Sequence, residues 1–84
     1  MVAETLSSQS CKRRLARLLP GRVRASREAA GLSQPQLATF VGMSTSHVQH
    51  VESGKSWPTV WVLTTLAFVL GASLDAWLDL RDDG

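Results

Sequence analysis

The chain has 84 residues, of which 44% are hydrophobic, enough for one domain with a modest core and too few for two. Its one cysteine, Cys11, excludes a disulfide within the chain and a metal cluster built on several cysteines, and it suits a reducing cytoplasm. The opening residues MVAETLSSQS lack the basic start and apolar stretch of a signal peptide, so we do not expect export.

The net charge of +2 hides an uneven distribution. Residues 1–55 hold eight of the nine basic residues and three acidic ones, a net charge of +5, whereas residues 56–84 hold one basic and four acidic residues, a net charge of −3. This division predicts either a basic face for a polyanion or a mixed, solvated surface.

Residues 1–9 are small and polar, and we expect a flexible tail there. Residues 10–21 follow as a basic, helical N-terminal extension, with Leu15, Leu18 and Leu19 on one face. Pro20 and Gly21 interrupt this helix, either as a kink or as the start of the next one.

The stretch RVRASREAAG resumes the helical pattern and ends at Gly31. Its inner side is predicted to carry Val23, Arg27 and Ala30. The stretch LSQPQLATFVG has the signals of a further helix, with a serine cap, a proline in the first turn and a final glycine. Those positions are Ser33, Pro35 and Gly42, and the buried stripe is Leu37, Ala38 and Val41.

Two residues later, Ser44 can cap another helix, TSHVQHVES, whose only apolar positions are Val48 and Val51. Two short helices joined by a glycine turn, the second with a narrow apolar stripe, indicate a helix-turn-helix.

No charged residue occurs from 56 to 74, which raises the question of a membrane span. The apolar stretch TVWVLTTLAFVL has about half of the roughly 20 residues that a spanning helix needs, so we predict a core helix and no membrane. Thr59 caps this helix and Gly71 ends it; its expected inward positions are Val60, Leu63, Ala67 and Leu70.

Ser73 caps a last helical piece, SLDAWLDL, with Leu74, Trp77 and Leu78 inward. There is no strand-like alternation, so we predict an all-α fold, a compact bundle of four to five short helices with a central helix-turn-helix and a short basic N-terminal extension. The helix-turn-helix domain is expected over residues 22–80, followed by a charged tail at 81–84.

Residues 23–78 resemble the helix-turn-helix domain of the lambda-repressor and Cro type, also called Xre-type. The resemblance rests on LSQPQLA, Gly42 in the turn, HVQHVESGK, Pro58 and LGASLDAWL. It implies a small DNA-binding domain in which helix 44–53 enters the major groove. The base-reading positions that it implies are Thr45, Ser46 and His50, with Gln49 in support.

Phosphate contacts are expected around the same helix-turn-helix, where helix N-termini favour an anion. The expected residues are Gln34, Ser44, His47 and Lys55. The basic run at 12–17 is either an arm that contacts phosphates through Arg13 and Arg14 or a solvated helix face.

His47 and His50 are the only histidines and lie three residues apart. A zinc pair lacks a third or fourth ligand nearby, and an acid–base pair needs a pocket and a nucleophile that a short exposed helix does not offer. We therefore favour hydrogen bonding to bases or phosphates over these two readings and over a plain solvated surface. Base discrimination then depends on DNA shape and deformability, or binding strengthens when the histidines are protonated.

The resemblance also implies an ion pair between Arg27 and Glu52 that ties the first helix of the domain to the third. In the C-terminal half, apolar residues exceed what one small core can bury, which indicates a dimer or partner interface or else a monomer with stray exposed groups. The interface residues expected are Trp61, Val62, Phe68, Val69 and Leu80.

The sequence thus predicts a cytoplasmic, bacterial or phage, dimeric regulator of transcription that binds double-stranded DNA, most simply a repressor. It predicts no enzyme activity, no cofactor and no metal. The alternative is a protein-interaction module, such as an antitoxin-like or adaptor subunit, that binds a protein partner through the apolar helix 60–70.

Overall fold

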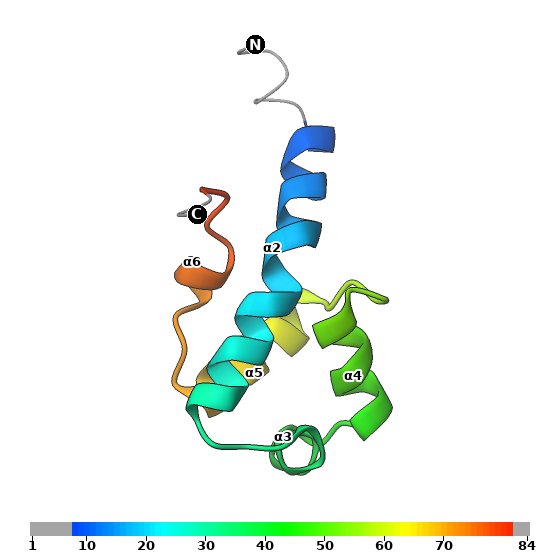
Figure 1. Cartoon of the computed structure of the whole chain (residues 1–84), viewed down its shortest axis with the longest axis vertical. Helices are drawn as coiled ribbons and strands as arrows, with labels where there is room; N and C mark the ends of the chain where they lie inside the picture. The colour runs from blue at the N-terminus through cyan, green and yellow to red at the C-terminus, as the bar shows by residue number, and fades with distance from the viewer. Residues whose placement is uncertain (1–7, 82–84) are drawn as a thin grey trace.

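A computed structural model of the chain describes residues 8–81, which form five helices and no strand (Figure 1). The helices are α2 (Ser8–Ala29), α3 (Gln34–Val41), α4 (Thr45–Ser53), α5 (Val60–Leu70) and α6 (Leu74–Trp77). In Figure 1, α2 is the long axis, with α4 on one side and α6 with the C-terminal segment on the other, and α2 contacts both. The predicted all-α bundle with a central helix-turn-helix is confirmed.

The first helix is longer than the sequence pattern predicted. α2 runs without interruption for 22 residues, through Pro20, so the alternative of a new helix starting at Pro20 is wrong. A proline inside a helix removes one hydrogen bond, but Leu19 and Val23 are buried on either side of it, and this packing holds both halves in one helix. Of the expected N-terminal tail, Ser8 and Gln9 belong to α2, whereas residues 1–7 lie outside the described residues, as do residues 82–84.

The later helices begin at the predicted caps. Ser33, Ser44, Thr59 and Ser73 each accept a hydrogen bond from a backbone N–H in the first turn of the helix that follows. At α3 the cap is reciprocal, because the Gln36 side chain also accepts from the Ser33 N–H at 2.8 Å.

The core is a single cluster to which every helix contributes. Its buried apolar residues are Leu19, Val23, Leu37, Ala38, Val48, Val51, Leu63, Leu66, Ala67 and Trp77. Trp77 places α6 against α2, because its Nε1–H donates to Ser26 Oγ at 3.0 Å.

Three positions expected to face inward are wrong: Ala30 is exposed, Leu78 is 38% exposed and Val60 is 76% exposed. On α5, Leu66 is buried where Val60 was expected. This helix is apolar on every side, so its sequence does not show which stripe faces the core.

Candidate nucleic-acid interface

α3 and α4 are joined by a tight turn at Gly42. Its φ of 70° is in the left-handed region that glycine adopts without strain, and the next N–H, that of Met43, donates to Ala38 O at 2.9 Å. Ala38 is buried near this turn, where a small side chain lets the two helices approach closely. The geometry is that of a helix-turn-helix.

α4 is anchored from one side only. Val48 and Val51 are buried, and on the opposite side Ser46, Gln49 and His50 are exposed. We call Ser46, Gln49 and His50 the reading face. Thr45 and His47 are half-buried at its edges, so the structure groups all the expected base-reading side chains on the outer half of one short helix.

The start of α4 offers backbone donors as well as side chains. Ser44 Oγ accepts from the His47 N–H at 3.0 Å, which satisfies one of the amide groups at this helix end. The remaining amides and the helix dipole leave this exposed end attractive to an anion.

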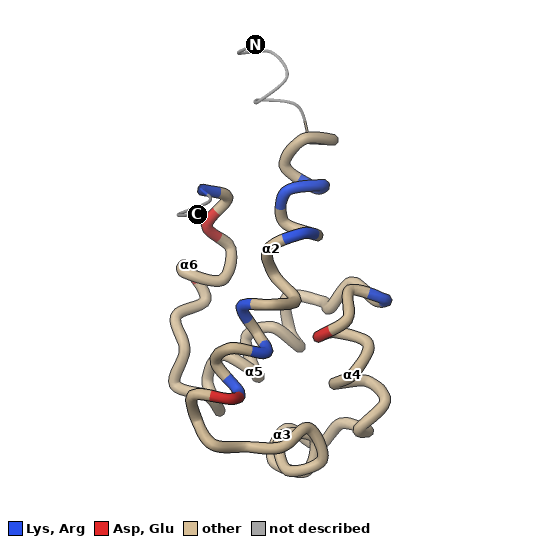
Figure 2. Tube along the Cα trace, viewed as in Figure 1, with Lys and Arg blue, Asp and Glu red and all other residues tan. Residues whose placement is uncertain are grey.

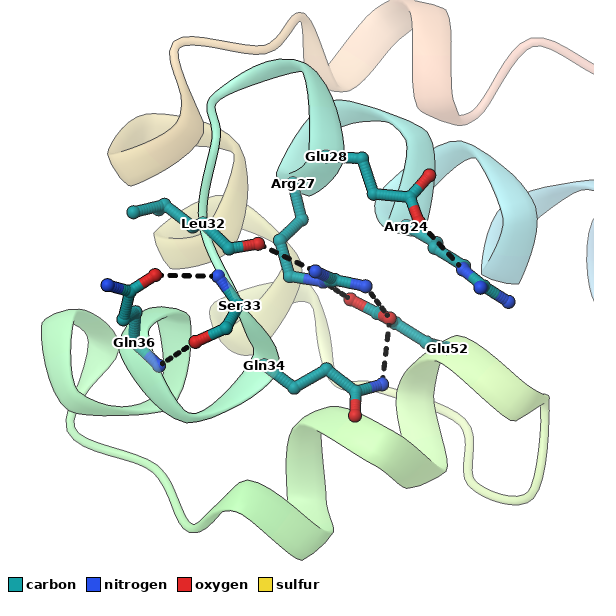
Figure 3. A network of polar contacts seen from close by, with 8 residues as sticks. All are labelled: Arg24, Arg27, Glu28, Leu32, Ser33, Gln34, Gln36 and Glu52. Atoms are coloured by element: carbon teal, nitrogen blue, oxygen red, sulfur yellow. Dashed lines mark hydrogen bonds and ion pairs between the residues drawn. The ribbon is translucent and has the colours of Figure 1, made fainter.

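A network of polar contacts fixes α4 against α2 and α3 (Figure 3). Arg27 donates from Nε to Glu52 Oε2 at 2.7 Å and from Nη2 to Glu52 Oε1 at 3.1 Å, and its Nη1 donates to Leu32 O at 2.6 Å. The hydrogen bonds that Arg27 donates to the Glu52 carboxylate raise the pKa of Arg27 above its ordinary value. With both partners charged and enclosed, the pair sets the position of α4.

Gln34, expected at a phosphate, also belongs to this network. Its Nε2 donates to Glu52 Oε1 at 3.0 Å, so α3 is tied to the same carboxylate as α2. Sequence reasoning missed this contact because the spacing of Gln34 and Glu52 carries no signal for it. A glutamine amide has two N–H donors, and one contact to Glu52 leaves the second for another acceptor.

A family model described as a helix-turn-helix domain matches residues 18–78, nearly three quarters of the chain. The chain belongs to this family. It is therefore a helix-turn-helix protein, a class that binds DNA. No curated protein and no solved structure matches the chain.

Besides Gln34, Ser44 and His47, three residues are expected at phosphates, and they lie at two places. Lys55 is exposed in the loop that follows α4, and Arg13 and Arg14 are exposed in the first half of α2, which precedes the matched residues. Figure 2 shows basic positions in blue on this half of α2 and in that loop. The structure does not bring Arg13 and Arg14 together with the reading face.

The helix-turn-helix domain also exposes aromatic side chains on α5. Trp61 is 79% exposed and Phe68 is 86% exposed, and we call these two residues the aromatic patch. Val62 and Val69, expected in the same interface, are half-buried and pack partly against the core. Leu80 lies instead beside Ser10 and Cys11 of α2. Further exposed apolar side chains, which the sequence reading did not assign to the interface, are Phe40, Trp57 and Val60.

One polar residue without any sequence signal holds the C-terminal end of the domain. Arg22 of α2 donates from Nη1 to Ala76 O at 3.2 Å, to Trp77 O at 3.1 Å and to Asp79 O. Its Nη2 donates to Arg81 O at 3.1 Å. A guanidinium carries several N–H donors, and those of Arg22 reach both α6 and the segment after it. The bonds to Asp79 O and Arg81 O hold residues 78–81, which we call the C-terminal strap, along α2.

Within residues 8–81, no three His, Cys, Asp or Glu side chains are grouped so that they could hold a metal ion. Among the same residues, no helix combines the length and the apolar character needed to cross a membrane.

Proposed function

We propose that this protein is a sequence-specific regulator of transcription, a repressor of the lambda-repressor and Cro type, that places α4 in the major groove of double-stranded DNA. The observation that carries the proposal is the one-sided anchoring of α4. Because Val48 and Val51 hold its inner side, the reading face is left for base edges, as a recognition helix requires.

Each expected contact has a chemical basis. Thr45, Ser46 and His50 offer hydroxyl and imidazole groups to base edges, and Gln49 offers the one amide that can bind adenine with two hydrogen bonds. Phosphates are taken by the α4 N-terminus at Ser44 and by the flanking side chains Gln34, His47 and Lys55.

The composition of the reading face sets the mode of discrimination. Apart from Gln49 it lacks the arginine or asparagine side chains that read bases with paired hydrogen bonds. Specificity therefore draws partly on DNA shape and deformability.

A symmetric dimer through α5 completes the proposal. Proteins of this architecture read two half-sites about 34 Å apart, which needs two copies of α4 related by a two-fold axis. The aromatic patch is the surface that we assign to the contact, because exposed aromatic side chains gain most from burial against a second copy.

A second candidate function rests on the same patch. Trp61 and Phe68 would equally serve a protein-interaction module, antitoxin-like or adaptor, in which α5 binds a different protein and DNA binding is secondary. The main proposal places the protein with the DNA of a bacterial or phage-infected cell.

Selection of bound duplexes from a random pool, at about 0.15 M salt where nonspecific phosphate binding is weak, tests the main proposal. We expect an enriched inverted repeat whose half-site spacing gives the dimer geometry. Absence of enrichment with folded protein contradicts sequence-specific reading and favours the interaction module.

A further inference from the structure

Two segments of the described chain lie outside the family match, and they lie against each other. The match begins at residue 18, so it leaves out the first ten residues of α2, Ser8–Arg17, which we call the overhang. It ends at residue 78 and leaves out most of the C-terminal strap. Leu80 of the strap lines a small cavity with Ser10, Cys11 and Arg14 of the overhang. This chain therefore adds a two-part element to the helix-turn-helix domain.

The added element is braced on the side where the strap lies. The hydrogen bonds from Arg22 to Asp79 O and Arg81 O hold the strap along α2, and Leu80 of the strap lies beside Cys11 and Arg14 of the overhang. An unsupported helix end of this length frays in water, whereas packing of this kind keeps it helical. The overhang is thus a projecting helix with a fixed direction relative to the domain.

The overhang carries one sign of charge. It contains Lys12, Arg13, Arg14 and Arg17, and no acidic residue occurs in α2 before Glu28. Side chains from Arg13, Arg14 and Arg17, together with Ser10, line one shallow surface groove. Like charges on neighbouring turns of a helix repel one another, so an anion bound along this side of the overhang relieves that repulsion.

The base of the overhang lies where the reading helix ends. The loop after α4 packs on α2, since Gly54, Ser56 and Trp57 line a cavity with Ala16 and Pro20. Lys55 belongs to this loop, and the overhang continues past it for roughly 15 Å, the length of ten helical residues (Figure 1). The base of the overhang is thus next to the C-terminal end of α4 and away from its N-terminal end.

We propose that the overhang binds the phosphate backbone of duplex DNA beside the groove that α4 reads, with Arg13 and Arg14 as its main contacts. This inference rests on the proposed function. Charge complementarity selects a polyanion, and continuity with Lys55 selects the same duplex that α4 occupies. The overhang raises affinity without reading sequence, because phosphates carry no base information.

The test compares the wild type with two double variants: Arg13→Gln with Arg14→Gln, and Arg13→Lys with Arg14→Lys. Both replacements are good helix formers at exposed positions, so the fold is retained, and circular dichroism checks it. Affinity is measured across a series of salt concentrations on two duplexes. One is just long enough for the selected site, and the other extends it by about one helical turn, ~10 base pairs, on each side.

On the long duplex we expect the Gln variant to bind about three- to tenfold more weakly at moderate salt. The slope of log K against log salt should be shallower by about 1.8, or roughly 0.9 for each lost phosphate contact. The Lys variant should recover the wild-type slope, and the short duplex should abolish the difference. If the wild type and the Gln variant have equal slopes of log K against log salt on the long duplex, the proposal is overturned. The basic side of the overhang would then bind a different partner, such as an acidic protein.

The same variants separate this inference from the proposed function. If selection enriches no sequence, the comparison is run on a random duplex of about 40 base pairs, where binding is carried by phosphate contacts alone. A shallower slope for the Gln variant then supports phosphate binding by the overhang, although sequence-specific binding by α4 is contradicted. If a sequence is enriched and the slopes are equal, sequence-specific binding is supported and phosphate binding by the overhang is overturned.

Discussion

Arg27 and Glu52, 25 residues apart in the chain, form an ion pair in which the arginine side chain is 9% exposed and the carboxylate side chain 3% exposed. Both oxygens of Glu52 accept from Arg27, and one also accepts from Gln34. One carboxylate therefore joins α2, α3 and α4. The orientation of the reading face depends on this junction, although none of the three residues belongs to that face.

Replacing Glu52 with alanine should cost about 3–5 kcal/mol of unfolding free energy, because Arg27 then stays enclosed without a partner. Urea unfolding measures the loss. The matched control is Glu28→Ala, which breaks the exposed Arg24–Glu28 pair, with side chains 63% and 55% exposed, and should cost less than about 1 kcal/mol. An unchanged midpoint for Glu52→Ala would refute the structural role of the pair.

Local signals in the sequence were enough to place most helix ends. Ser33, Ser44 and Thr59 cap helices, and Gly42 ends α3, because each of these effects acts within one turn of backbone. The inward positions of α4 were equally clear, since Val48 and Val51 are its only apolar residues. Because Val48 and Val51 are buried, the opposite side of α4 is exposed to solvent, and the residues on that side could be predicted from the sequence.

Contacts between distant segments could not be predicted in this way. The bonds from Arg22 to the strap join residues more than 50 positions apart, and an interaction with a backbone carbonyl leaves no signal in the sequence. The continuity of α2 through Pro20 depends on tertiary packing that overrides the local preference. On α5 the choice between Val60 and Leu66 as a core residue depends on which side of the helix meets the domain, and apolar residues occur on every side of it.

Two glycine substitutions should change stability in opposite directions. Gly42 has a φ of +70°, so Gly42→Ala should lower the unfolding free energy by about 1–2 kcal/mol through backbone strain alone, since a Cβ there meets nothing within 4 Å. Gly21 lies inside α2 with equal space around it, so Gly21→Ala should raise stability by about 0.5–1 kcal/mol. Thermal unfolding of the two variants side by side tests both signs, and a loss of stability at Gly21 would contradict the continuous helix.

The strap should give a small acid-sensitive contribution to stability. Hydrogen bonds from the Arg81 side chain, and then from its backbone N–H, lower the pKa of Asp79 from 3.8 to about 2. A carboxylate with a lowered pKa stabilises the fold above the unfolded value and loses this effect as pH falls, here from about 4 towards 2. The unfolding midpoint of the wild type should therefore exceed that of Asp79→Asn at pH 6 and approach it near pH 2. If the difference between the two unfolding midpoints were the same at pH 2 as at pH 6, the ionised Asp79 carboxylate could not be its cause.

Changes on the reading face should alter sequence preference and leave stability intact. In the double variant Ser46→Ala with His50→Ala, each lost base contact should remove about 0.5–1.5 kcal/mol of discrimination against the wrong base, the usual contribution of a single hydrogen bond. Its unfolding free energy should stay within about 0.5 kcal/mol of wild type, because both side chains are exposed. Ser53→Ala, an exposed change at the other end of α4, is the control and should leave the preferred sequence as it is. Identical enriched sequences for the double variant and the wild type would assign recognition to another surface.

The aromatic patch should decide the oligomeric state. Trp61→Ser with Phe68→Ser removes the two most exposed aromatic side chains of α5, and each should weaken a dimer by about 2 kcal/mol or more if it lies at the centre of the contact. Sedimentation at several concentrations measures the dissociation constant, which should rise at least tenfold per side chain. Leu66→Ala is the contrasting change on the same helix: Leu66 is buried, so its replacement should cost about 2–5 kcal/mol of folding free energy.

DNA binding gives a second measurement of the dimer. Half-site DNA should bind the monomeric Ser variant as it binds wild type, whereas the full inverted repeat should bind it more weakly. A wild-type protein that stays monomeric at every concentration would contradict the dimer. The aromatic patch would then be assigned to contact with a different protein, because its exposed side chains would still lack a partner.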